Sequence, residues 1–177
     1  MNKNKKIFQQ LKTQHSKLNT SVYVILGSKS DAEYGQAAVK ILEGFSISVK
    51  LWFASAHRSP EWLDEVLRKG EKEGVTVYIC AAGGAAHLPG VVASKVSQPV
   101  IGVGIPAKYL NGFDSLLSLV QMPSGIPVAV AGLGETGMKN SAYFAAQILA
   151  VRDKRLTQAL KNFRQKQAED VKIANQK

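Results

Sequence analysis

The sequence of 177 residues contains a single cysteine, Cys80, so no disulfide can form within the chain. Cys80 ends an apolar run, and we expect a buried, unreactive side chain in a reducing compartment. No apolar run approaches the ~20 residues that cross a membrane. The basic first residues lead into Ile7 and Leu11 without the apolar core of a secretory signal. We therefore predict a cytoplasmic protein that has no membrane partner.

Histidine is also scarce, and the three present are His15, His57 and His87. They lack the spacing of metal ligands, and no cluster of cysteines or carboxylates joins them, so we expect no metal site. The glycines match neither the Gly-x-Gly-x-x-Gly fingerprint of dinucleotide folds nor a Walker loop. ATP and NAD are not implied, and we expect no cofactor. His15 lies in a basic tail, where we expect it to be exposed to solvent.

The net charge of +10 resides in the two ends of the chain. Residues 1–20 carry five lysines and no acidic residue, and residues 151–177 carry eight basic against three acidic residues. The span 21–150 contains ten residues of each sign and is neutral. Basic tails around a neutral centre indicate solubility or contacts within an assembly. No nucleic-acid motif accompanies the charge, so we expect no nucleic-acid partner.

The length favours one domain, which buries about 70% of its unfolded surface. We predict a basic N-terminal extension at 1–20, a catalytic α/β domain at 21–152, and an amphipathic helix with a frayed tail at 153–177. Within the last segment, Leu156, Leu160 and Phe163 form an apolar stripe at helical spacing.

Short runs rich in apolar and β-branched residues alternate with helical patterns from residue 21 onward. This alternation predicts a three-layer, doubly wound parallel sheet of the flavodoxin-like α/β class. The predicted strands are 22–26, 47–53, 75–80, 99–103 and 127–131. The predicted helices are 32–44, one beginning at Pro60, 88–96, 113–120, 138–151 and one after Arg152.

Ligands in such folds bind at the carboxyl ends of the strands, where the strand order reverses. With the order 2-1-3-4-5, the loops after the first three strands become neighbours. These three loops carry most of the reactive side chains of the chain, and we take them as one candidate site.

The first loop is Gly27-Ser28-Lys29-Ser30-Asp31. Its hydroxyls and the N–H groups of the helix start suit a phosphate, and Asp31 can accept hydrogen bonds from ribose hydroxyls. The alternative is purely structural, with Ser30 or Asp31 capping the helix.

The second loop, 54–60, contains Ser55, His57 and Arg58. A guanidinium offers a planar fork for phosphate, and an imidazole can carry a proton near neutral pH. The structural alternative is a histidine bonded to backbone, with Arg58 in a surface ion pair.

The third loop is the glycine-rich turn at 82–90, which holds His87. Its small residues around two glycines would leave a void unless a ligand fills it, so we favour a binding role over a simple turn with a helix cap.

Together these motifs are similar to the bacterial mutase branch of the aminoimidazole ribonucleotide carboxylase family. The resemblance spans about Val22 to Leu160. It rests on Gly-Ser-Lys-Ser-Asp at 27–31, Ser-Ala-His-Arg at 55–58, Ala-Gly-Gly-Ala-Ala-His-Leu-Pro-Gly at 82–90, Asp-Ser-Leu-Leu-Ser-Leu-Val-Gln-Met-Pro at 114–123 and Ala-Ala-Gln-Ile-Leu-Ala at 145–150.

The resemblance implies an isomerase of purine biosynthesis that converts 5-(carboxyamino)imidazole ribonucleotide to 4-carboxy-5-aminoimidazole ribonucleotide by decarboxylation and recarboxylation. His57 matches the general acid/base of the family. Residues matching the ribonucleotide-binding positions are Ser28 and Arg58 for the phosphate, Asp31 for the ribose, and Ser55, Ala82, Gly83, Gly84, Ala85, His87 and Leu88 around the pocket. The family uses no metal or cofactor and is typically a homo-octamer, and the stripe of Leu156, Leu160 and Phe163 would suit packing on a neighbour.

Some positions depart from the usual family pattern. Ala32 stands where the family has tryptophan, Gly104 stands where it has proline, and 129–134 differs from the commoner version. Two alternative functions remain open at this point. One is a carboxylase acting on a related heteroaromatic ring, and the other is a noncatalytic nucleotide-binding module whose basic tails contact RNA.

Overall fold

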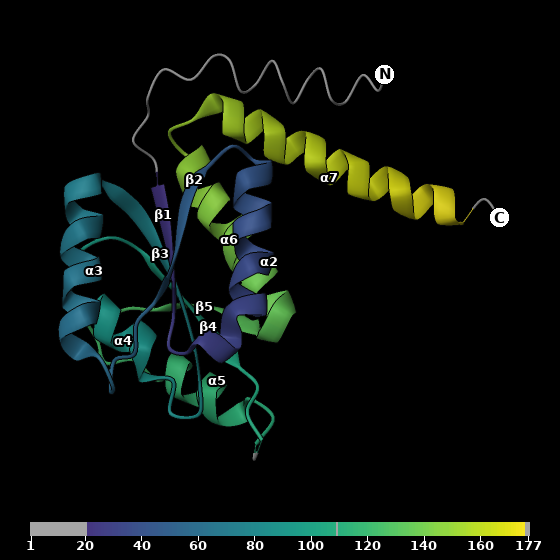
Figure 1. The fold of residues 1–177 in the computed structure, drawn as a ribbon. Coiled ribbons are helices and arrows are strands. Elements are labelled where there is room, and N and C mark those ends of the chain that lie inside the picture. Colours follow the sequence, from purple (N-terminus) through teal and green to yellow (C-terminus); the bar gives the residue numbers. More distant parts are fainter. Residues whose placement is uncertain (1–20, 109, 176–177) are drawn as a thin grey trace.

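The computed structural model describes residues 21–108 and 110–175, and the predicted extension at 1–20, with His15, lies outside them. Strands and helices alternate along the described chain (Figure 1). The strands are β1 (Ser21–Leu26), β2 (Ser48–Phe53), β3 (Val75–Gly83), β4 (Val100–Ile105) and β5 (Ala129–Leu133). The helices are the short 3₁₀ helix η1 (Lys29–Asp31), α2 (Ala32–Gly44), α3 (Pro60–Glu73), α4 (His87–Ala93), α5 (Phe113–Val120), α6 (Gly134–Ala150) and α7 (Lys154–Ala174).

The strands form one parallel sheet in the order β2-β1-β3-β4-β5. Helices α2 and α6 cover one face, and α3 and α4 cover the other (Figure 1). This three-layer, doubly wound arrangement confirms the predicted flavodoxin-like class. It also confirms that the carboxyl ends of β1, β2 and β3 are neighbours.

Strand β1 supplies side chains to the cores on both faces of the sheet. Val22, Val24 and Leu26 join the core under α2 and α6, whereas Tyr23 and Ile25 join the core under α3 and α4. All five side chains are fully buried. Alternation along a strand places neighbours on opposite faces, and burial of each large apolar side chain contributes about 1.5–3 kcal/mol. The uninterrupted apolar run in the sequence is therefore explained by burial on both faces.

Strand β3 continues past its predicted end at Cys80 as far as Gly83, which pairs with Ile105 of β4. A Cβ at Gly83 would lie 2.9 Å from the Ile105 carbonyl oxygen, so glycine permits this close pairing. The predicted turn at 82–90 is therefore wrong in extent, because only 84–86 separate β3 from α4.

Other boundaries differ by a few residues. Strand β5 begins at Ala129, two positions after Pro127, because proline has no N–H to donate to the ladder. Helix α6 begins at Gly134 rather than Met138, since its first turn is polar and does not show the apolar spacing of the rest. Helix α4 ends at Ala93, earlier than predicted.

Cys80 is fully buried, as predicted. Burial raises the pKa of its thiol, which therefore stays protonated and unreactive at neutral pH. Among the described residues, no helix is long and apolar enough to cross a membrane.

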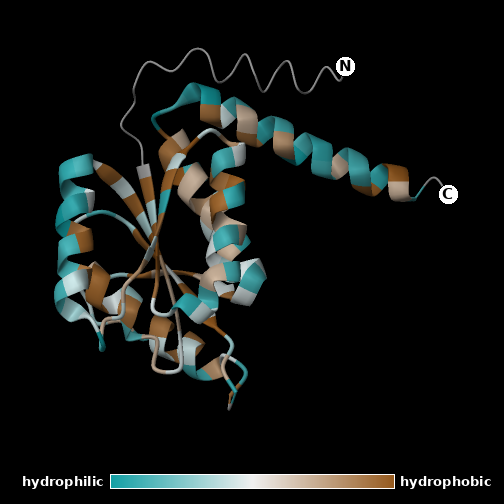
Figure 2. Cartoon of the chain, viewed as in Figure 1, coloured by the Kyte–Doolittle hydropathy of each residue, from teal (hydrophilic) through white to brown (hydrophobic). Residues whose placement is uncertain are grey.

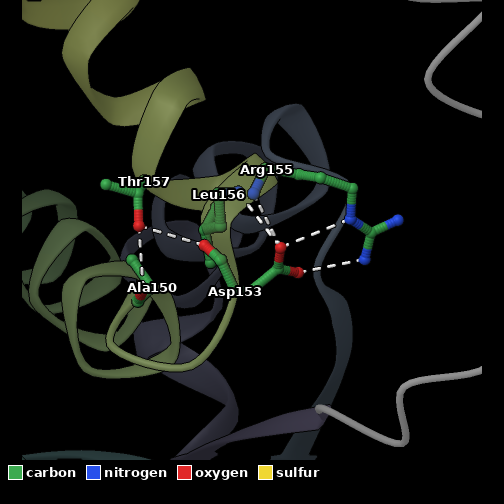
Figure 3. A network of polar contacts seen from close by, with 5 residues as sticks. All are labelled: Ala150, Asp153, Arg155, Leu156 and Thr157. Atoms are coloured by element: carbon green, nitrogen blue, oxygen red, sulfur yellow. Dashed lines mark hydrogen bonds and ion pairs between the residues drawn. The ribbon is translucent and has the colours of Figure 1, made fainter.

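A compact polar network joins α6 to α7 (Figure 3). The Asp153 carboxylate caps α7 by accepting hydrogen bonds from the Arg155 N–H at 2.9 Å and the Leu156 N–H at 3.4 Å. It also accepts from the Arg155 guanidinium at 3.0 Å. The Thr157 hydroxyl lies 2.8 Å from the Ala150 carbonyl and so ties the new helix to the end of the previous one. These contacts fix the direction in which α7 leaves the domain.

The first half of α7 packs on its own chain. Leu156 and Leu160 are buried in the core under α2 and α6. Phe163 stacks on Tyr143 with ring centroids 4.8 Å apart and meets Phe45 edge-on at 5.9 Å. The expectation that this stripe packs on a neighbouring subunit is therefore wrong, because α2 and α6 already occupy it.

The second half of α7 extends away from the domain and is largely polar (Figures 1 and 2). Its two large apolar side chains, Val171 and Ile173, are 64% and 60% exposed. This half of the helix lies beyond the core of its own chain.

Replacement of Asp153 tests the helix cap. Asp153→Ala should lower the free energy of unfolding by about 1 kcal/mol at pH 7, because an N-cap is lost. The contacts with Arg155 hold the pKa of the Asp153 carboxyl below its usual range. A depressed pKa stabilises the fold above the unfolded value of about 3.9, and this contribution disappears as the pH falls through the folded value. Urea unfolding at pH 7 and pH 3 measures the free energy of unfolding of both proteins. The difference between Asp153→Ala and wild type should be smaller at pH 3. An equal difference at both pH values would contradict the role of the Asp153 carboxylate as helix cap.

Candidate active site

Three loops meet at the carboxyl edge of the sheet: 27–31 after β1, 54–59 after β2 and 84–86 after β3. Backbone hydrogen bonds continue from the strands into these loops. The Ala54 N–H donates to the Leu26 carbonyl at 2.9 Å, and the Gly27 N–H donates to the Ala81 carbonyl at 3.2 Å. The loops are therefore held in register by the same parallel pairing that orders the strands.

The first loop is organised by Ser28. Its Oγ accepts a hydrogen bond from the Ser30 N–H at 3.3 Å and lies 2.8 Å from the Ser30 hydroxyl. The Ser30 hydroxyl lies 3.0 Å from the Asp31 carboxylate, to which it donates because a carboxylate can only accept. Ser28 thus caps η1, and Asp31 makes no capping bond to α2. The structural alternative that placed the cap on Ser30 or Asp31 is wrong. Asp31 is half-buried.

The second loop folds around Ser55. The Ser55 Oγ accepts from the Arg58 N–H at 3.2 Å, and the Ser55 N–H donates to the Ser59 Oγ at 3.0 Å. These bonds orient Arg58 toward the first loop, where its Nη2 donates to the Gly27 carbonyl at 2.9 Å. Arg58 is exposed, is bonded to a backbone carbonyl and forms no ion pair with any residue of the described ranges, in contrast to the alternative of a surface ion pair.

The role of Ser59 was not evident from the sequence. Ser59 precedes Pro60 and looks like a helix cap, yet its side chain makes no capping bond to α3 and turns back to Ser55 instead. The adjacent Ser-Pro pair is a signal of a helix start, and it does not indicate which backbone group the hydroxyl will meet.

The second loop reaches the start of α4 through its histidine. His57 Nε2 and His87 Nδ1 are 2.8 Å apart, with ring centroids 4.9 Å apart and rings nearly perpendicular. The structural alternative for His57 was a hydrogen bond to the backbone. The contact seen here joins the two imidazole rings instead. One nitrogen must donate and the other accept. Two neutral rings therefore share one tautomer, with the hydrogen on Nε2 of both rings when His57 donates and on Nδ1 of both when His87 donates. Both residues are exposed.

The third loop is tight and built from small residues. Gly84 and Ala86 have φ angles of 61° and 45°, in the left-handed region that glycine tolerates and alanine adopts only with strain. The Ser118 hydroxyl of α5 donates to the Ala85 carbonyl and holds the loop from the outside. The sequence gives no local signal for this contact, because Ser118 and Ala85 are 33 positions apart.

The predicted pocket residues do not all face the site. Ala85 and Gly83 are exposed at the edge, and Ala82 is half-buried. Leu88 is only 2% exposed, and its side chain lies near Gly27 within the core under α3 and α4. Leu88 therefore supports the first loop from beneath, and its side chain does not line an open surface.

The structure accounts for one departure from the family pattern. A Cβ at Gly104 would lie 2.4 Å from Leu133 Cδ2 and 2.5 Å from the Ser115 Oγ. Ser115 is buried and donates to the Gly112 carbonyl at 2.8 Å. Glycine at 104 therefore leaves room for the side chains of Leu133 and Ser115. Ala32 is half-buried at the start of α2, and no described contact accounts for its replacement of tryptophan.

Across the described ranges 21–108 and 110–175, no group of three or more histidine, cysteine or acidic side chains is arranged to hold a metal ion. The site instead combines a cation, Arg58, with a carboxylate, Asp31, two imidazoles and the hydroxyl of Ser28. Such a set can bind an anion, orient a polyhydroxyl group and transfer a proton.

Comparison with known proteins gives relatives of one family. Residues 21–170 match the family described as AIR carboxylase. The N5-carboxyaminoimidazole ribonucleotide mutase of Saccharolobus solfataricus is 51% identical over 150 residues, covering 85% of this chain and 94% of that protein. The protein of the same name from Escherichia coli K12 is 45% identical over 85% of this chain and 89% of its own length. A crystal structure of a Treponema denticola PurE2 variant has a TM-score of 0.82 at 26% identity, with 89% of this chain and 96% of that chain covered.

Replacement of Ser118 tests how the third loop is held. Ser118→Ala removes a hydrogen bond that contributes about 1 kcal/mol, so amide hydrogen exchange at 84–86 should accelerate about fivefold. Exchange measured by mass spectrometry would check this, with the exposed Ser124→Ala as the matched control. Unchanged protection in Ser118→Ala would show that the loop is held by other contacts.

Proposed function

The chain belongs to the AIR carboxylase family, and we propose that it converts 5-(carboxyamino)imidazole ribonucleotide to 4-carboxy-5-aminoimidazole ribonucleotide in purine biosynthesis. The enzyme is an isomerase of the mutase type. The proposal is carried by two side chains of the second loop in a chain 51% identical to a named mutase. Arg58 contacts the first loop at Gly27, and His57 contacts His87 at the start of α4, directly after the third loop. The alternatives of another ring carboxylase or an RNA-binding module have no comparable support.

The reaction balances within one substrate. The bond between the exocyclic nitrogen and the carboxylate breaks and releases carbon dioxide, and the nitrogen takes up a proton. The ring carbon C4 then attacks the carbon dioxide, a carbon–carbon bond forms, and C4 loses its proton so that the ring regains aromaticity. We assign both proton transfers to His57, which would end the cycle in the protonation state in which it began.

The first two loops would hold the ribonucleotide. Arg58 uses one N–H on the Gly27 carbonyl and keeps other N–H groups of its fork for the phosphate. Ser28 follows Gly27 directly in the chain, and we assign its hydroxyl to the phosphate as well. Asp31 would accept hydrogen bonds from the ribose hydroxyls. The Arg58 bond to Gly27 supports this assignment, because it holds Arg58 next to Ser28 before substrate binds. Both side chains assigned to the phosphate are then already close together.

The third loop would enclose the imidazole and the released carbon dioxide. Ser55, with Ala82, Gly83, Gly84 and Ala85, presents small surfaces that allow close approach of a flat ring. In a single chain this edge is open, since both histidines and Ala85 are exposed. Retaining carbon dioxide requires a closed site. We therefore propose that a second copy of the chain completes the enclosure.

A homo-octamer in the cytoplasm is the assembly that we propose. Apolar side chains exposed around α5 support association, with Leu110, Phe113, Leu117 and Val120 between 53% and 65% exposed. Side chains of this size are seldom exposed together unless another surface covers them. Because α2 and α6 already cover the first half of α7, the α5 surface is the better candidate for contact between subunits. Light scattering would measure the mass of the assembly, and a monomer at micromolar concentration would contradict the proposal.

The proton-transfer assignment distinguishes the two histidines. With purified protein and the carbamate substrate, formation of the carboxylated imidazole is measured at neutral pH. His57→Asn should lower kcat by at least about 100-fold, since general acid–base catalysis is lost. His87→Asn removes the neighbour of His57 and should keep kcat within about tenfold of wild type. A large loss in His87→Asn with activity retained in His57→Asn would reverse the assignment, and no turnover by wild type would refute the proposed function.

Arg58 should act on binding more than on chemistry. Arg58→Gln removes charge-assisted hydrogen bonds to the phosphate and should raise KM about 10- to 100-fold with a smaller change in kcat. Arg152→Gln, which removes an exposed arginine far from the loops, is the matched control. Steady-state kinetics would measure the effects on KM and kcat separately. A lowered kcat at unchanged KM would contradict phosphate binding by Arg58.

A further inference from the structure

A cavity lies on the α3 and α4 face of the molecule, at the other edge of the sheet from the three loops. It is lined by α3 between Asp64 and Glu71, by Tyr78 of β3 and by residues 95–98, which lead into the amino end of β4. The cavity measures about 440 Å³. None of the residues assigned to the mutase reaction lines it. A volume of this size falls in the range of small-molecule sites.

Tyr78 places an unpartnered polar group against this cavity. Its side chain is fully buried, and within the described part of the chain its hydroxyl has no hydrogen-bond partner. Burial raises the pKa of Tyr78 to about 12, so the hydroxyl keeps its proton and can donate. A buried donor without an acceptor is unfavourable, and natural proteins contain few of them. The hydroxyl is therefore available to an acceptor that the described residues do not supply.

Helix α3 is built to leave room for this hydroxyl. A Cβ at Gly70 would lie 2.4 Å from the Tyr78 Oη, so any larger residue there would displace the hydroxyl or the helix. Glycine inside a helix costs stability relative to alanine. Glycine at position 70 therefore lowers the stability of α3, and the Tyr78 hydroxyl beside it is buried without a partner among the described residues. Close packing alone requires neither feature.

The rim of the cavity carries charges of both signs. Lys95 and Asp64 pair with each other at 2.9 Å and join α3 to the segment after α4. Arg68 and Glu71, three positions apart on the lining face of α3, form no ion pair within the described residues. The four charges balance, so the cavity does not favour an ion of one sign. It presents one unpaired cation, one unpaired anion and one buried donor.

We propose that this cavity binds a small zwitterion, an α-amino acid whose side chain carries a hydrogen-bond acceptor. The carboxylate of the ligand pairs with Arg68, and its ammonium group pairs with Glu71. The acceptor at the end of the side chain receives the Tyr78 hydroxyl hydrogen. An anion such as phosphate leaves Glu71 without a partner, and an apolar ligand leaves all three groups without one.

Titration calorimetry of the full-length protein with L-glutamine, and with L-norleucine as a ligand of the same backbone charges without a side-chain acceptor, tests the proposal. Glutamine should bind saturably and norleucine at least about tenfold more weakly, which is the loss expected for one hydrogen bond. Tyr78→Phe should weaken glutamine by the same factor and leave norleucine unchanged. The absence of saturable glutamine binding overturns the proposal.

Two further measurements separate a ligand site from a packing feature. Because the hydroxyl has no partner among residues 21–108 and 110–175, the thermal midpoint of ligand-free Tyr78→Phe should equal or exceed that of wild type. Turnover of the carbamate substrate should be unchanged. A lower midpoint would show that the hydroxyl serves the fold, which overturns the proposal. Arg68→Gln and Glu71→Gln should each weaken both amino acids at least about tenfold, whereas Lys72→Gln on the exposed side of α3 should not. Equal affinities in all three variants would also overturn it.

Discussion

The pairing of β1 with β2 on one edge and β3 on the other is the constraint on which the rest of the structure depends. It buries β1 on both faces, separates the two cores and brings three loops to a common edge. Each loop is short, so its side chains have little freedom once the strands are in register. Arg58 can reach the Gly27 carbonyl only because β1 and β2 end side by side. The arrangement of the site is thus a direct result of strand order.

Much of this could be read from the sequence because the signals are local. The run at 22–26 has the apolar character of a strand buried on both faces, and the structure places a strand there. Pro60 begins α3, and the helix ends at Gly74 in the left-handed conformation that glycine adopts readily. The three loops were identified because each follows an apolar run and is rich in side chains that carry chemistry.

The contacts between loops could not be predicted, because they join residues far apart in the chain. The Arg58–Gly27, His57–His87 and Ser118–Ala85 contacts span 31, 30 and 33 positions. The extent of β3 was missed for the same reason, since Gly83 is a strand residue only through its pairing with Ile105. Likewise, nothing near Gly70 in sequence indicates the Tyr78 hydroxyl that excludes a side chain there. Sequence patterns locate the elements, and tertiary packing decides which atoms meet.

The length of α7 has a consequence for how the chain end behaves. At 1.5 Å per residue, its 21 residues extend about 30 Å, and only the part as far as Phe163 has a core beneath it. A free helical segment shorter than ~12–15 residues is only marginally stable in water. The outer part of α7 is therefore expected to hold its shape only while something covers it. If another copy does so, mass action ties the helical content of the protein to its concentration. On dilution, the end of the chain would then unwind while the sheet stays intact.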